Sequence, residues 1–139
     1  MTLRCLFTLL IATPLLEAQP LTADGFALPQ PGKVFAFPRD HGSHPEFRTE
    51  WWYVTGHLDA AEDQRFGFQV TFFRQARRQD GKTLHLHLAH AALLDARTGS
   101  FAHEERLNRE GWDAASSETT LDVRNGNWSL KLDEATQHL

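Results

Sequence analysis

Histidine has the widest chemical range of the side chains in this sequence, because imidazole can bind a metal or exchange a proton near neutral pH. The 139 residues include eight histidines, and His85 and His87 would share one face of a strand, as paired strand ligands do. The histidines that could complete a site are His41, His44, His57 and His90. Leucines at 84, 86 and 88 alternate with the pair, so we expect the leucines to face inward and His85 and His87 to face water. His90 shares the leucines' parity and is expected inside, and no metal site is predicted.

No motif for a nucleophile or a cofactor accompanies these histidines. The chain lacks a Gly-x-Ser-x-Gly elbow, and a triad is seldom assembled from sequence neighbours such as Ser43 and His44. The single cysteine, Cys5, excludes an internal disulfide. The net charge of −4 argues against nucleic acid as a partner. We therefore expect no cofactor and no nucleic-acid partner.

Most of the chain has the pattern of strands joined by turns. Segments with period-two alternation or β-prone composition are 47–59, 65–76, 83–95, 119–124 and 128–133, with a weaker candidate at 34–37. Asn125-Gly126 is a strong hairpin signal, and further turns are predicted at 79–82 and 97–100. Consecutive strands without a crossover helix predict an all-β fold, an antiparallel meander that curls into a barrel.

The loop at 60–64 sets a register if it is a hairpin connection. Glu50 then lies opposite Arg74, at the end of an otherwise apolar face, and the two are predicted to form an ion pair. The other pairs on this face are Trp52–Phe72, Val54–Val70 and Leu58–Phe66, and those on the opposite face are Trp51–Phe73, Tyr53–Thr71 and Thr55–Gln69. Because both faces carry aromatic residues, we expect both to be covered.

Residues 1–18 have the layout of a secretory signal peptide. Arg4 precedes an apolar run at 5–16 that is too short to span a membrane, and Ala18 is a small residue at the expected cleavage site. A buried N-terminal helix is the alternative, but Pro14 would break it. We therefore expect an exported protein, periplasmic or secreted, with no membrane span. It would begin near Gln19, with an extended lead-in at 19–33 and one domain at 34–139.

Several runs of the sequence resemble the AttH / carotenoid 1,2-hydratase family. They are FPRDHGSH at 37–44, EWWYVTGHL at 50–58, FGFQVTFFR at 66–74, AHAA at 89–92, Phe101 and ERL at 105–107. The resemblance implies two lipocalin-like β-barrels in tandem, with an apolar ligand site in or between them. The family's chains are more than twice as long, so we expect an incomplete first barrel here, with the second barrel absent from this chain.

The resemblance implies two alternative functions. One is a module that binds a hydrophobic small molecule, with candidate ligand-binding residues Trp51, Trp52, Tyr53, His57, Gln69, Phe73 and His90. The other is the N-terminal part of a hydratase or related enzyme that acts on isoprenoid-like substrates. Hydration of an alkene begins with proton transfer to carbon from a protonated acid, for which Glu50, Asp40 and His41 are the candidates. An ion pair with Arg74 would instead keep Glu50 charged.

Overall fold

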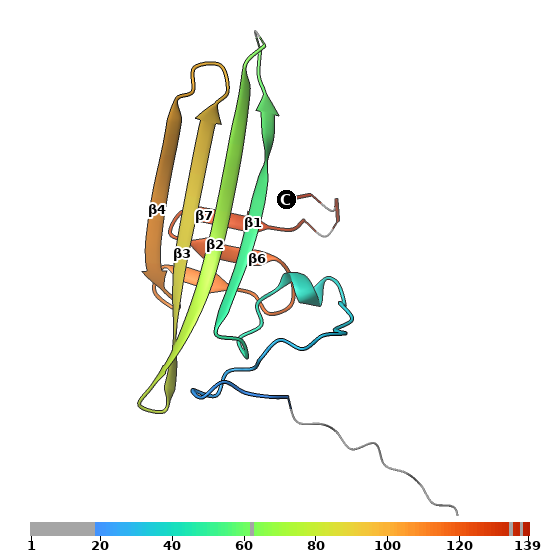
Figure 1. Ribbon diagram of the computed structural model, residues 1–139, viewed down its shortest axis with the longest axis vertical. Coiled ribbons are helices and arrows are strands. Elements are labelled where there is room, and N and C mark those ends of the chain that lie inside the picture. Colours follow the sequence, from blue (N-terminus) through green and yellow to red (C-terminus); the bar gives the residue numbers. More distant parts are fainter. Residues whose placement is uncertain (1–18, 62, 134, 137) are drawn as a thin grey trace, which may run out of the picture.

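The first sheet is an antiparallel meander of four long strands. The computed structural model describes residues 19–61, 63–133, 135–136 and 138–139. Strands β1 (Thr49–Asp59), β2 (Arg65–Gln79), β3 (Lys82–Asp95) and β4 (Phe101–Arg109) are hydrogen-bonded in the order β1-β2-β3-β4. A short 3-10 helix, η1 (Arg39–His41), precedes β1. The four strands lie side by side along the long axis of the molecule (Figure 1).

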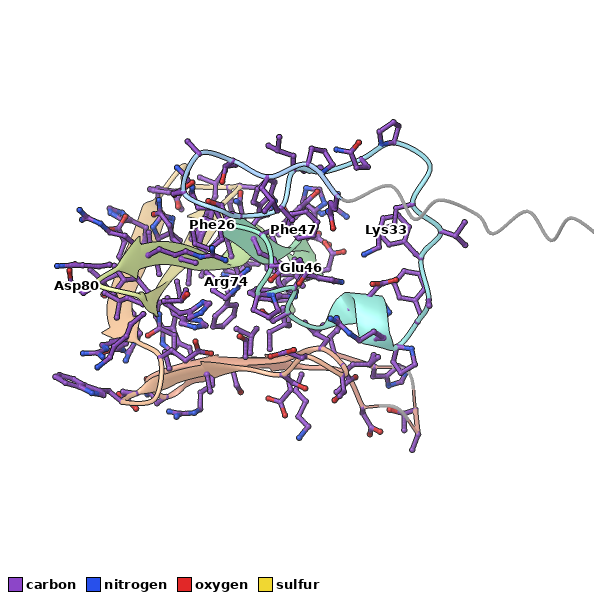
Figure 2. The ribbon with its side chains drawn as sticks, turned by 90° about the horizontal axis from the view of Figure 1, so that it is seen from below. Phe26, Lys33, Glu46, Phe47, Arg74 and Asp80 are labelled. Carbon is purple, nitrogen blue, oxygen red and sulfur yellow. The ribbon has the colours of Figure 1, made fainter. Side chains whose placement is uncertain are left out.

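A second, smaller sheet packs against one face of the first. Its strands β5 (Ala114–Ser116), β6 (Asp122–Asn125) and β7 (Trp128–Lys131) run across those of the first sheet (Figure 1). Seen along the long strands, the first sheet lies between the lead-in and the second sheet (Figure 2). The all-β antiparallel fold is therefore confirmed, and within the described residues the two sheets do not close into a barrel. None of the helices described is long and apolar enough to cross a bilayer.

The register expected for β1 and β2 is confirmed. Glu50 pairs with Arg74 and Trp52 with Phe72 on one face, and Trp51 pairs with Phe73 on the other. The predicted turn at 79–82 is also present, and it joins β2 to β3 through two residues. Both of these, Asp80 and Gly81, have positive φ, at 51° and 73°, which is the geometry that matches the twist of the flanking strands.

Two strands were not expected, and one expected strand is absent. Residues 34–37 form no strand; Val34 and Phe35 are 88% and 63% exposed. Strands β4 and β5 lack clear alternation, and β4 reads FAHEERLNR, in which polar residues occur on both faces. Pairing with β3 along the whole of β4 gives this polar segment its extended structure.

The core lies between the two sheets. Its buried members are Phe72, Ala89, Leu121 and Val123. Partly buried side chains surround them, namely Trp52, Val70, Trp128, Leu130 and Leu132. The indole N–H of Trp52 donates to the carbonyl of His41 at 2.9 Å, so this tryptophan also ties η1 to the sheet. The core-facing side of the first sheet is called the inner face below, and the opposite side the outer face.

The lead-in is anchored by a single aromatic side chain. Phe26 is 1% exposed and lies between the guanidinium groups of Arg48 and Arg78, whose central carbons are 5.7 and 4.9 Å from its ring centre. Figure 2 shows Phe26 on the lead-in side of the first sheet.

The expected orientation of β3 is wrong. His87 is 1% exposed and faces the second sheet, whereas Leu86 is 38% exposed on the outer face, where His90 also lies. The alternation separates the two faces correctly, but it does not say which face the second sheet covers. That sheet packs on the small side chain of Ala89, which leaves room for Leu121 and Val123.

The expectation that both faces of the first sheet are covered is also wrong for the residues described. Trp51 and Tyr53 on the outer face are 58% and 60% exposed. Leu107, on the same face of β4 at the opposite edge of the sheet, is 65% exposed. Away from the part that the lead-in covers, the outer face is therefore an open aromatic and apolar surface.

Candidate functional site

A hydrogen-bonded group of charged side chains lies on the inner face, at the end of the sheet near η1. Glu50 accepts from the hydroxyl of Ser43 at 3.0 Å and from the backbone N–H of His44 at 2.9 Å. Arg74 Nε donates to Oε2 of the same carboxylate at 3.3 Å. All these partners donate, so the surroundings of Glu50 fit an ionised carboxylate.

Arg74 is the largest fully buried side chain of the described residues, with 1% of its surface exposed (Figure 2). Besides Glu50, it donates to the carbonyls of His44 and Phe47 at 2.9 and 3.0 Å. It also donates from Nη1 to Nδ1 of His85 at 3.0 Å. The guanidinium group therefore fixes the loop that enters β1 as well as the pairing of β1, β2 and β3.

His44 connects this ion pair to a second carboxylate. Its Nδ1 lies 2.7 Å from Oε1 of Glu50, and its Nε2 lies 2.8 Å from Oδ1 of Asp40. Each ring nitrogen of His44 therefore lies within hydrogen-bond distance of a different carboxylate. The backbone N–H of Ala36, followed by His44 and Lys33, holds the pKa of Asp40 well below its usual range. Asp40 is therefore also ionised at neutral pH.

The other end of this group contains two histidines and Glu110. His85 Nδ1 and His87 Nε2 each lie 3.8 Å from one oxygen of the Glu110 carboxylate. Neither ring nitrogen of His87 has a hydrogen-bond partner. Burial lowers the pKa of both histidines from the ordinary 6.5, so neutral imidazole is favoured in the folded protein. Within the described residues, no set of three His, Cys, Asp or Glu side chains is arranged to hold a metal ion.

The burial of His87 makes stability depend on pH. Because its pKa is lower in the folded state than the ordinary 6.5, the unfolded chain binds a proton that the folded chain does not. Stability is therefore full above about pH 6.5 and falls below it, by up to about 1.4 kcal/mol per pH unit for one group, until the folded-state pKa is reached. We expect His87→Leu to flatten this decline in urea unfolding between pH 8 and pH 5.

The exposed His57 provides the matched control for that prediction. His57→Gln removes one histidine without changing a buried group, so the decline should persist. An unchanged decline in His87→Leu would show that His87 is not the buried group responsible.

An open cleft of about 370 Å³ adjoins Glu50. It is lined by Asp40, His41, Trp51, Trp52, Leu121 and Leu130, among others. All three candidate acids and bases therefore lie at one cleft. Two of them, however, are held as ions by the contacts described above, and the chemistry of a general acid requires a proton on the group.

The outer face has two adjoining clefts near the loop ends of the same strands. The first, about 480 Å³, is lined by Thr55, Gly56, His57, Gly67, Phe68, Gln69, Ala92, Leu94 and Phe101. The second, about 260 Å³, is lined by Gln69, His90, Ala91, Ala92, Phe101, His103, Glu104 and Glu105. Gln69, Ala92 and Phe101 line both, so the two clefts form one continuous depression across β1 to β4, which is called the outer groove below.

The seven candidate ligand-binding residues divide between the faces. Trp52 lies on the inner face in the core, and the other six lie on the outer face: Trp51, Tyr53, His57, Gln69, Phe73 and His90. Three of these, His57, Gln69 and His90, line the outer groove. The sequence did not identify Phe101, His103 and Glu105 as groove residues, because β4 was not recognised as a strand. Their spacing of two residues places them on one face only once β4 is known to be a strand, which the composition of this segment does not signal.

The class of protein defined by this architecture is an open, all-β, two-sheet protein with a buried charged cluster inside and an apolar groove outside. A family model described as AttH-like matches residues 28–139, so the chain belongs to the AttH-like family. No curated protein and no solved structure gives a significant match to it.

Proposed function

We propose that this protein binds a hydrophobic small molecule in the outer groove. The observation that carries the proposal is the combination of two adjoining clefts with exposed aromatic side chains on the same face. Phe101, shared by both clefts, is 62% exposed, and Trp51 and Tyr53 extend the apolar surface along β1. Soluble proteins rarely leave such a contiguous apolar surface open unless it serves binding.

The size of the groove suits a small molecule rather than a single ion. The two clefts, of about 480 and 260 Å³, lie within or near the range of about 300–1,000 Å³ that is common for ligand pockets. The walls are mostly apolar, and a few polar groups, including Gln69 and His90, occur between them. Such a lining favours a ligand that is mostly apolar and carries one or a few polar groups.

The hydratase alternative finds less support in the inner cleft. Protonation of an alkene needs an acid that holds its proton at working pH. The donors around Glu50 stabilise its charged form, and Asp40 has a lowered pKa. We therefore propose that the protein binds its ligand and that Glu50 and Asp40 do not catalyse a reaction of it.

Equilibrium dialysis of labelled farnesol, an isoprenoid alcohol, tests the proposal. We expect saturable one-to-one binding that Phe101→Ala weakens about tenfold, since a ligand that covers this exposed ring would gain about 1.5–3 kcal/mol from the contact. Trp112→Ala is the control, because Trp112 is 79% exposed between β4 and β5 and lines neither outer cleft. Equal affinity of wild type and Phe101→Ala would exclude the outer groove as the site.

We also propose that the protein is exported, on the strength of the signal-like residues 1–18, which lie outside the described residues. The mature product should begin at Gln19 or within a few residues of it. Mass spectrometry of the exported product measures this directly. A product that retains Met1 and Cys5 would contradict it.

A further inference from the structure

We propose that the β3–β4 part of the outer groove accepts the uncharged polar end of an apolar ligand and rejects a carboxylate. This inference rests on the proposed function, because it specifies which hydrophobic molecules the groove binds. It makes hydroxyl-bearing molecules the ligands of this protein and excludes fatty acids. The observations that carry it are the positions and charges of the polar side chains in the cleft of about 260 Å³.

The apolar sides of this cleft hold its polar residues in place. The ring of Phe73 meets the ring of His90 edge-on at 5.4 Å, and Phe101 stacks on His103 at 5.8 Å. His90 Nε2 lies 3.5 Å from Oε1 of Glu105 on the neighbouring strand.

Gln69 offers unused hydrogen-bonding capacity where the two clefts meet. Its side-chain N–H donates to the hydroxyl of Thr71 at 3.2 Å, and Thr71 is 4% exposed. This contact orients the amide, whose oxygen accepts no hydrogen bond from the described residues. A ligand hydroxyl could donate to that oxygen, or to the carboxylate of Glu105, and the groove supplies both acceptors.

The charges of the cleft oppose an anion. The carboxylate of Glu105, which pairs with His90 on the outer face, lines it, no lysine or arginine of the described residues does, and the whole chain has a net charge of −4. A carboxylate bound in the cleft would be repelled by the like charge of Glu105 and would lose water that the cleft does not replace with a cation. An alcohol of the same chain length escapes this penalty, because it has no charge.

Equilibrium dialysis of two twelve-carbon ligands, 1-dodecanol and dodecanoate, tests this selectivity. The measurement is made at pH 8, with each ligand below its aggregation concentration. We expect wild type to bind dodecanol at least about tenfold more tightly. Glu105→Gln should raise the affinity for dodecanoate about threefold to fivefold, because it removes one exposed like charge. The affinity for dodecanol should change by less than about twofold. Glu118→Gln, which removes the same charge from an exposed loop outside the groove, should change neither affinity.

The outcomes separate this inference from the proposed function. Dodecanoate binding as tight as dodecanol binding, or no effect of Glu105→Gln on dodecanoate, would overturn the selectivity but leave a hydrophobic site. An absence of saturable binding by either ligand would overturn the proposed function, and the inference with it.

Discussion

Replacing Glu50 with glutamine is expected to lower the free energy of unfolding by about 3–5 kcal/mol, because a buried charge loses its counter-ion. Arg74, which is 1% exposed, would keep its guanidinium charge in the core. Arg74→Met should have a loss of similar size, because it leaves Glu50 without its cation and removes the hydrogen bonds that Arg74 donates to the carbonyls of His44 and Phe47. Urea unfolding monitored by tryptophan fluorescence measures both losses.

The double variant separates an interacting pair from two independent residues. If Glu50 and Arg74 stabilise each other, the double variant should lose less than the sum of the single variants. The exposed pair Asp59–Arg65, which also joins β1 to β2, is the matched control, and Asp59→Asn should lower the free energy of unfolding far less than Glu50→Gln does. Strict additivity at Glu50 and Arg74 would contradict the central place given to this ion pair.

Asn125→Ala is expected to cost about 2–4 kcal/mol, because Asn125 connects the two sheets through buried hydrogen bonds. Its side-chain N–H groups donate to the carbonyls of His87 and Arg106 at 2.9 and 3.2 Å, and its oxygen accepts from Asn108 at 2.6 Å. The residue itself is fully buried. Alanine would remove all three of these hydrogen bonds between the sheets.

Asn127→Ala is the control for this prediction, since Asn127 is exposed in the same hairpin. It should change the free energy of unfolding by less than about 0.5 kcal/mol. A similarly small change for Asn125→Ala would show that the sheets are held together by apolar packing alone.

The sequence was most informative where contacts are local. The β1–β2 register followed from one short loop, and with it came the proximity of Glu50 and Arg74 and the separation of Trp52 from Trp51 and Tyr53. The β2–β3 turn followed from Asp80-Gly81. In each case, neighbours in sequence determine neighbours in space.

The rest depended on contacts between distant segments. The second sheet determines which face of β3 is buried, so the alternation of His85 and His87 with leucines was assigned the wrong way round. The bonds from His44 to Asp40 and Glu50 require the path of the loop before β1, which has no periodicity. Asn125 belonged to a recognised turn signal, and its role between the sheets could be seen only once β6 lay beneath β3 and β4.

Chemical-shift mapping of the isotope-labelled protein with farnesol is the most direct test of the outer groove as a binding site. We expect saturable changes at Thr55, Gln69, His90 and Phe101, and at the side-chain amide of Gln69, with little change at Ser43 and Glu50 at the other end of the sheet. Changes that centre on Glu50 and Trp52, or no saturable changes at any residue, would contradict it.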